Sequence, residues 1–336
     1  MKKQFLLVIL ALIISDTVSC QIFKKSESLK KENDSINVIQ LADSLFIDHD
    51  IKNYSLRVFT NYKVKQFRIK NGDFKSRYIP NNRFGLGVGF ASSKVLIDLA
   101  FNVKTDKEEV TYRFDAQGTM IFRKHHYANG YIQSYKGFDV RNNFNEPNEF
   151  RDDIKSFTIG FNYLYTLSEI EFSYSRLKAG LAKRNKNVYI TGGAGFFGVY
   201  DYFSANGNIL PVNGENYYNE QAEIKRYNSM AVGVLGGFLS VFMLPKNFIA
   251  SVNIMPGIAL MAKKVTLQDD SYRPSKPMLY KLDFAISLGY HVERYYINLI
   301  YGTDIYSTDL NFGNKYAFNL TKAKLAFGYR LGVNKK

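Results

Sequence analysis

The residues best placed to do chemistry are acids, bases and amides that alternate with apolar residues along the chain. In runs such as Val95–Val103 and Tyr280–Val292 they take every second position, so each run gathers its polar side chains on one face. Such a face could line a charged constriction that selects solutes, or it could form a salt-bridged interior. We favour the interior, and its candidate residues are Asp98, Asn102, Asn162, Lys281, Asp283, Asp304, Lys324 and Arg330.

No other pattern predicts catalysis or ligand binding. The glycine clusters at 192–195 and 233–237 lack the Gly-Lys-Ser/Thr end of a phosphate loop, and no G-x-S-x-G nucleophile motif occurs. His125 and His126 are neighbours on an expected strand and should point to opposite faces. Neither recurs at a metal-ligand spacing. We therefore predict no catalytic, cofactor-binding or metal-ligating residues and no enzymatic activity.

The stretch Phe84–Val103 indicates which elements carry the polar residues. Its first half alternates large apolar residues with glycines, and the alternation resumes after a short turn at 91–94. A period of two predicts strands, and so short a turn predicts an antiparallel hairpin. The hairpin has one wholly apolar face. A soluble sandwich would bury that face in its core, whereas a membrane barrel would turn it towards lipid.

The length of the runs favours the barrel. Several alternating runs reach the ~9–11 residues that a tilted strand needs to cross a membrane, whereas soluble strands average about 5–6 residues. Short turns and longer polar loops, such as 71–83 and 204–227, mostly alternate along the chain. We predict an all-β fold, an antiparallel transmembrane β-barrel of about 12 strands (range 10–14) over residues 54–333, with both chain ends in the periplasm.

Two segments need separate interpretation. Residues 168–186 are too long for the short turn expected there, and they could form a periplasmic hairpin or fold inward to narrow a pore. Met230–Leu244 is apolar enough to suggest a transmembrane helix. However, it is shorter than a span requires and it contains three glycines, which disfavour a helix interior. We predict a strand there.

The N-terminus carries an export signal. Two lysines precede the apolar run Phe5–Ile14, which is too short to span a bilayer, so residues 1–20 read as a signal peptide. Cleavage after Cys20 is favoured over cleavage before it with attachment of lipid. Residues 21–53 should form a charged periplasmic linker with a short helix within 36–47. The chain is thus expected to cross the inner membrane and reach the cell outer membrane.

Composition narrows the partners. The 336 residues carry a net charge of +15, but the basic residues are scattered and form no recognition module, so we expect no nucleic acid. Trp is absent, and 25 Tyr and 27 Phe suit the aromatic girdles of a membrane barrel. A single cysteine excludes an intrachain disulfide. The expected partners are outer-membrane lipid and the export and barrel-assembly machinery, with no cofactor and the oligomeric state left open.

Several short motifs after residue 50 are similar to those of one protein family. They are Leu56-Arg57-Val58, Tyr78-Ile79-Pro80-Asn81, Phe114-Asp115-Ala116-Gln117, Gln133-Ser134-Tyr135-Lys136-Gly137-Phe138 and Phe172-Ser173-Tyr174. On these motifs the chain resembles a group of Bacteroidetes proteins known as domain of unknown function 4421. It departs from their pattern after Tyr174. The resemblance implies an outer-membrane barrel without an assigned activity, and it supplies no catalytic residues.

The functional expectation follows from the architecture. We expect a non-enzymatic outer-membrane barrel that is either structural or a small-solute pore. Two alternatives stay open: a barrel enzyme that acts on lipid or peptide at the cell surface, and a soluble exported β-sandwich that binds a ligand.

Overall fold

The computed structural model describes six stretches of the chain: residues 54–91, 95–102, 109–123, 125–167, 188–292 and 294–331. All of them belong to one compact unit. The signal peptide, the linker and the segment 168–186 lie outside the described residues. The described residues contain no helix with the length and apolarity that crossing a membrane takes.

Within the described residues the chain forms fourteen strands and two short 3-10 helices, η1 (Gly214–Asn216) and η2 (Glu220–Ala222). The strands are β1 (Tyr54–Asn71), β2 (Phe74–Ile79), β3 (Phe84–Ala91), β4 (Val95–Asn102), β5 (Tyr112–Phe122), β6 (His126–Asn142), β7 (Glu149–Thr166), β8 (Val188–Ser204), β9 (Arg226–Met243), β10 (Phe248–Thr266), β11 (Ser271–Tyr272), β12 (Met278–His291), β13 (Tyr295–Asp309) and β14 (Asn314–Leu331).

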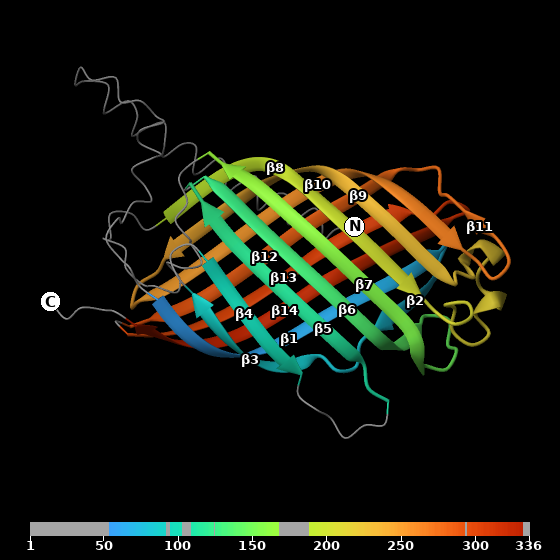
Figure 1. The fold of residues 1–336 in the computed structure, drawn as a ribbon, viewed down its shortest axis with the longest axis horizontal. Helices are drawn as coiled ribbons and strands as arrows, with labels where there is room; N and C mark the ends of the chain where they lie inside the picture. Colours follow the sequence, from blue (N-terminus) through green and yellow to red (C-terminus); the bar gives the residue numbers. More distant parts are fainter. Residues whose placement is uncertain are drawn as a thin grey trace, which may run out of the picture. The chain divides into compact units, whose positions relative to one another are not determined.

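The strands form one antiparallel sheet that closes on itself (Figure 1). One ring of ten strands runs β1-β2-β6-β7-β8-β9-β10-β12-β13-β14 and back to β1. Elsewhere the path from β1 to β6 passes through β3, β4 and β5 instead of β2, and the ring there has twelve strands. The prediction of an all-β antiparallel barrel, with about twelve strands, is confirmed.

The change in strand number comes from an interruption in the strand beside β1. The second half of β1 pairs with β2 and the first half with β3, so β2 and β3 follow β1 as one broken strand. The break lies at Pro80–Arg83, and proline cannot donate to a strand ladder. Arg113 of β5 secures the junction by donating to the carbonyl of Lys63 at 2.8 Å. Beyond the break β2 meets β6 directly, and the barrel narrows.

The two ends of the barrel differ in their connections. At one end a short turn at 244–247 joins β9 to β10, and we call it the short-turn end. At the other, the long-loop end, lie the connections 143–148, 205–225 and 267–277. In Figure 1 the long-loop end, with β11 and the 3-10 helices, is at the right.

Alternation along each strand separates an outer apolar wall from the interior. On β1, Leu56 and Val58 are 54% and 57% exposed, whereas Phe67 and Ile69 on the other face are 1% and 0% exposed. The same outward exposure recurs along β9, which the apolar run Met230–Leu244 forms as a strand rather than a helix, as predicted. The apolar side chains that would fill the core of a soluble sandwich therefore face outward.

Aromatic rings fill the interior near the long-loop end. Phe67 of β1 lies 4.4 Å from Tyr78 of β2 and 5.1 Å from Phe203 of β8, measured between ring centroids. Tyr227 of β9 continues the contact to Phe203 at 5.2 Å and to Tyr316 of β14 at 4.7 Å. Because β9 lies across the ten-strand ring from β1, these contacts cross the lumen. We call these five rings the aromatic layer.

Residues 205–225 form a cap that is tied to the barrel interior. The hydroxyl of Tyr78 donates to the carbonyl of Ile209 at 2.7 Å, and the hydroxyl of Tyr218 lies 3.0 Å from the hydroxyl of Ser76. Both contacts reach inward-facing residues of β2. The cap is therefore anchored to the same wall that supplies part of the aromatic layer.

The expectation of plain polar loops at 71–83 and 204–227 is wrong. The first loop contains β2, which closes the narrower ring. The second folds as the cap, in which Ile209 and Ile224 are each 0% exposed. A few apolar residues are enough to close a narrow opening. The overall composition of the second loop is polar, so its composition did not indicate that it packs against the barrel.

Candidate functional site

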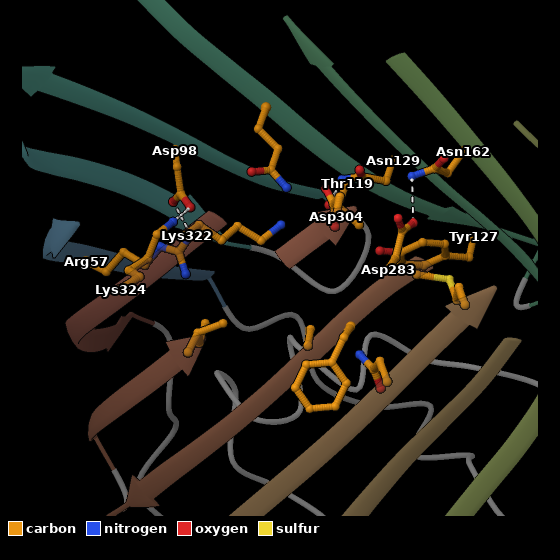
Figure 2. A pocket seen from close by; sticks show the side chains of 16 residues that line it. Arg57, Asp98, Thr119, Tyr127, Asn129, Asn162, Asp283, Asp304, Lys322 and Lys324 are labelled. Atoms are coloured by element: carbon orange, nitrogen blue, oxygen red, sulfur yellow. Dashed lines mark hydrogen bonds and ion pairs between the residues drawn. The ribbon is translucent and has the colours of Figure 1, made fainter. Parts of the chain in front are cut away.

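A polar cavity of about 100 Å³ lies inside the barrel, on the short-turn side of the aromatic layer (Figure 2). Its lining draws polar side chains from strands around most of the wall. Three cations and three carboxylates line it: Arg57, Lys322, Lys324, Asp98, Asp283 and Asp304. Because these charges balance, the lining by itself favours neither anions nor cations.

The first charged group in the cavity depends on a glycine. Arg57 of β1, Gly89 of β3 and Asp98 of β4 are consecutive partners in the sheet register. Because Gly89 has no side chain, the guanidinium of Arg57 passes over it and pairs with Asp98. Lys324 of β14 pairs with the other oxygen of the same carboxylate, and its ammonium lies 4.3 Å from the ring centroid of Phe59. Two predicted residues, Asp98 and Lys324, thus meet.

The second charged group lies across the cavity from the first and joins three predicted residues, of which Figure 2 shows Asn162 and Asp283. Lys281 of β12 donates to Asn162 Oδ1 of β7 at 2.5 Å and pairs with Asp283 Oδ2 at 2.7 Å. Its side chain is 0% exposed, and its ammonium also lies 4.6 Å from the ring centroid of Phe197. A charge is costly to bury unless it is paired, and the partners of the Lys281 ammonium offset that cost. Because Asn162 and Phe197 come from other strands, the group connects opposite walls of the barrel.

The remaining predicted residues lie apart from these groups. Asp304 of β13 lines the same cavity. Arg330 lies nearer the short-turn end, where it donates to the carbonyl of Val292 at 2.6 Å and to His291 Nδ1 at 2.9 Å. Asn102 lies opposite Gly85 in the sheet register, and its side chain is outside the described residues.

The structure contains a third charged group, whose residues were not predicted from the sequence. Lys65 of β1 pairs with Asp201 Oδ1 of β8 at 2.7 Å, and both side chains are 0% exposed. Thr158 and Tyr316 donate to the same carboxylate at 2.6 Å each. Tyr316 belongs to the aromatic layer, so this buried ion pair lies directly against it. Alternation along β1 places Lys65 on the same face as Arg57. Asp201 has aromatic neighbours in the sequence, so the local sequence does not identify it as the partner of Lys65.

The expectation that His125 and His126 are neighbours on one strand is wrong. His125 lies in the turn before β6 and only His126 lies in the strand, so the alternation of strand side chains does not apply to the pair. Both rings lie 5.4 Å from the ring of Tyr165. Among the described residues, no group of three or more His, Cys, Asp or Glu side chains is placed to hold a metal ion.

Solved structures offer resemblances of low identity. The outer membrane protease OmpT from Escherichia coli is 8% identical, with 86% of this chain and 100% of that chain covered and a TM-score of 0.40. The translocator domain of the autotransporter NalP from Neisseria meningitidis is 10% identical, with 94% and 98% covered and a TM-score of 0.33. At these identities and TM-scores the resemblances carry no argument about function.

Comparison with sequences gives a clearer result. No curated protein matches the chain. The model of the family described as "Domain of unknown function (DUF4421)" matches residues 41–332, which include every described strand. The chain therefore belongs to this family.

Proposed function

We propose that the chain is a non-enzymatic barrel of the cell outer membrane whose lumen is closed near the long-loop end. The aromatic layer is the observation that carries the closure. Its five rings come from β1, β2, β8, β9 and β14, are at most 1% exposed, and meet across the ring of strands. The buried Lys65–Asp201 pair closes the interior further on the cavity side.

The outer wall supports the membrane placement. Exposed apolar side chains recur on outward positions of most strands, and burying them in lipid removes the cost of exposing them to water. Tyr295 of β13 and Tyr329 of β14 lie 5.3 Å apart at the short-turn end, and Phe248 and Tyr290 lie 5.0 Å apart beside it. Aromatic residues in such positions are typical of the girdle at a membrane interface.

The wider proposal includes the expected partners and route. The protein would be exported through the inner membrane, would be inserted by the barrel-assembly machinery and would contact outer-membrane lipid, with no nucleic acid or cofactor. The resemblance in short motifs supports an origin in the Bacteroidetes. The polar cavity is the one observation that favours a second candidate, a gated pore for small solutes, which would have to open the aromatic layer.

Conductance in planar bilayers tests the closure. The full chain should give no steady current, because rings from opposite walls fill the lumen. The variant Phe67→Ala/Phe203→Ala removes two central rings and should produce open events. Phe238→Ala, on the outer face at 65% exposure, is the matched control and should stay closed. Steady current through the unchanged protein would refute the closed lumen and favour the pore.

A further inference from the structure

Basic side chains gather on the outer wall of the barrel near the long-loop end. On β1 the outward positions alternate with the buried Phe67 and Ile69, and two of these outward positions carry cations. Outward positions of the adjoining β14, β2 and β6 carry four more. We call these residues the basic patch: Arg68, Lys70, Lys75, Arg77, Arg141 and Lys315.

The sheet register arranges the basic patch in two rows. Lys70 lies opposite Lys315 of β14 on one side and Lys75 of β2 on the other. The arginines form the second row, because Arg77 of β2 lies opposite the arginines of β1 and β6. Since neighbouring strands are about 4.8 Å apart, each row spans about 10 Å, and the rows are about 7 Å apart. The patch therefore presents closely spaced cations on one continuous surface.

Within the described residues, carboxylates neutralise only part of this charge. Asp309 of β13 lies opposite Lys315 in the sheet register, and it pairs with Lys276 at 3.1 Å. One ion pair reaches the patch, from Asp139 to Arg141 at 4.0 Å, and the Arg141 side chain remains 49% exposed. Asp73 adds an exposed carboxylate in the turn between β1 and β2. Like charges that face each other across strands destabilise a sheet. An anionic ligand that lies across both rows would relieve this repulsion.

The position of the patch indicates which anion it meets, and this step rests on the membrane placement proposed above. Leu56 lies on the outward apolar face of β1, and Arg68 lies on the same face twelve residues further on. Twelve residues span roughly 40 Å along a strand, or about 30 Å along the axis of a barrel with a typical strand tilt. The hydrocarbon core of a bilayer is about 30 Å thick. The patch thus lies at the level of the lipid headgroups.

We propose that the basic patch binds the phosphate groups of a phosphorylated membrane lipid in the leaflet at the long-loop end. Arginine forks pair with phosphate oxygens in two-point contacts, and lysines add point charges around them. The outward positions directly below the patch are polar, at Gln66 of β1 and at Asn319 and Thr321 of β14. The acyl chains of the same lipid would lie beyond these residues, against the exposed apolar side chains of Val58 on β1 and Leu325 on β14. A soluble anion would gain the charge contacts without this apolar contact.

Binding of a labelled lipid to the full chain in phosphatidylcholine nanodiscs tests the proposal. The probe is a bis-phosphorylated glycolipid such as lipid A, compared with the same lipid stripped of its phosphates and with inorganic phosphate as a competitor. The variant Lys70→Gln/Arg77→Gln removes one cation from each row. Arg226→Gln/Lys264→Gln removes two exposed cations from outward positions of β9 and β10 at the same end, and it is the matched control.

The phosphorylated lipid should bind the patch variant at least about tenfold more weakly than the unchanged protein, because each cation near a membrane surface contributes about 1 kcal/mol. The control variant should bind normally. Equal weakening in both variants, or equal binding of the dephosphorylated lipid, would overturn the proposal. Full competition by inorganic phosphate would also overturn it, because the patch would then be a site for the free ion.

Heat-modifiable gel mobility separates this proposal from the one on which it rests. A folded barrel in nanodiscs should change mobility on heating for all three proteins. If the unchanged protein does not insert at all, the membrane placement fails. If it inserts but does not distinguish the two lipids, the placement stands and the phosphate site fails.

Discussion

Gly89 shows how one missing side chain organises the charged interior. It lies between Arg57 and Asp98 in the register of β1, β3 and β4, and the ion pair forms over it. A Cβ atom built there would overlap both partners. The Arg57 side chain is 0% exposed, so it cannot move into water when it is displaced. The glycine is therefore a requirement of packing rather than of a turn.

We predict that Gly89→Ala lowers the free energy of unfolding by about 1–3 kcal/mol, the usual cost of overpacking. The reason is that the new methyl group must push Arg57 away from Asp98. Gly118→Ala is the control, because no atom lies within 4 Å of the position its Cβ would take. Urea titration of the protein folded in lipid vesicles gives both values. Equal stability of the two variants would contradict this role for Gly89.

At the scale of elements, the cap and the broken strand β2–β3 work together. β2 supplies Ser76 and Tyr78, which hold the cap, and it also closes the narrower ring at the long-loop end. The cap, in turn, covers the aromatic layer beside which it is anchored. The break between β2 and β3 thus accounts both for the narrowing of the barrel and for the attachment of its cap.

The attachment of the cap should weaken at high pH through Tyr218. Burial raises the pKa of Tyr218 to about 12, above its ordinary value of 10.0, although a hydrogen bond to Ser76 opposes the shift. Because the folded state favours the neutral phenol, this stabilisation is complete below pH 10. It is lost as the pH rises from 10 through 12.

We therefore expect the stability difference between the unchanged protein and Tyr218→Phe to depend on pH. At pH 8 the unchanged protein should be more stable by about 0.5–1.5 kcal/mol, because its hydroxyl bonds the barrel wall. The difference should shrink between pH 10 and 12, as measured by urea titration at each pH. A difference that stays constant to pH 12 would rule out titration of Tyr218 as the cause.

For the whole molecule, the arrangement of faces is the feature with the largest consequence. Outside the basic patch the outer wall exposes apolar side chains on most strands, and the interior combines ion pairs with an aromatic seal. A soluble protein with this wall would expose a large apolar surface to water. In a bilayer the same wall would contact lipid acyl chains, which solvate apolar side chains favourably.

Arginine substitutions on the outer wall measure this directly. Val234 lies near the middle of β9 and is 62% exposed. In a bilayer, Val234→Arg should cost about 2–4 kcal/mol of folding free energy, and Leu244→Arg at the short-turn end about 0–1 kcal/mol. Folding titrations in lipid vesicles give both numbers. Two small and equal costs would indicate that water, rather than lipid, surrounds the wall.

The sequence alone determined most of the strands, their antiparallel pairing and which residues share the apolar face, and it favoured the outward direction of that face. These features follow from a period of two, which is local and repeats in every strand, as in Tyr280–Val292. It also placed Lys281 and Asp283 on the same inner face. It could not pair Asp98 with Arg57, because that contact depends on which strands become neighbours and on the glycine between them.

Only the tertiary structure decided whether the lumen is filled. Phe67 and Phe203 lie far apart in the chain, and nothing local to either residue shows that their rings meet. The contact depends on how many strands close the ring, and that number falls where β2 reaches β6. Ring closure is a long-range property of the sheet, so the sequence could predict a barrel without predicting its seal.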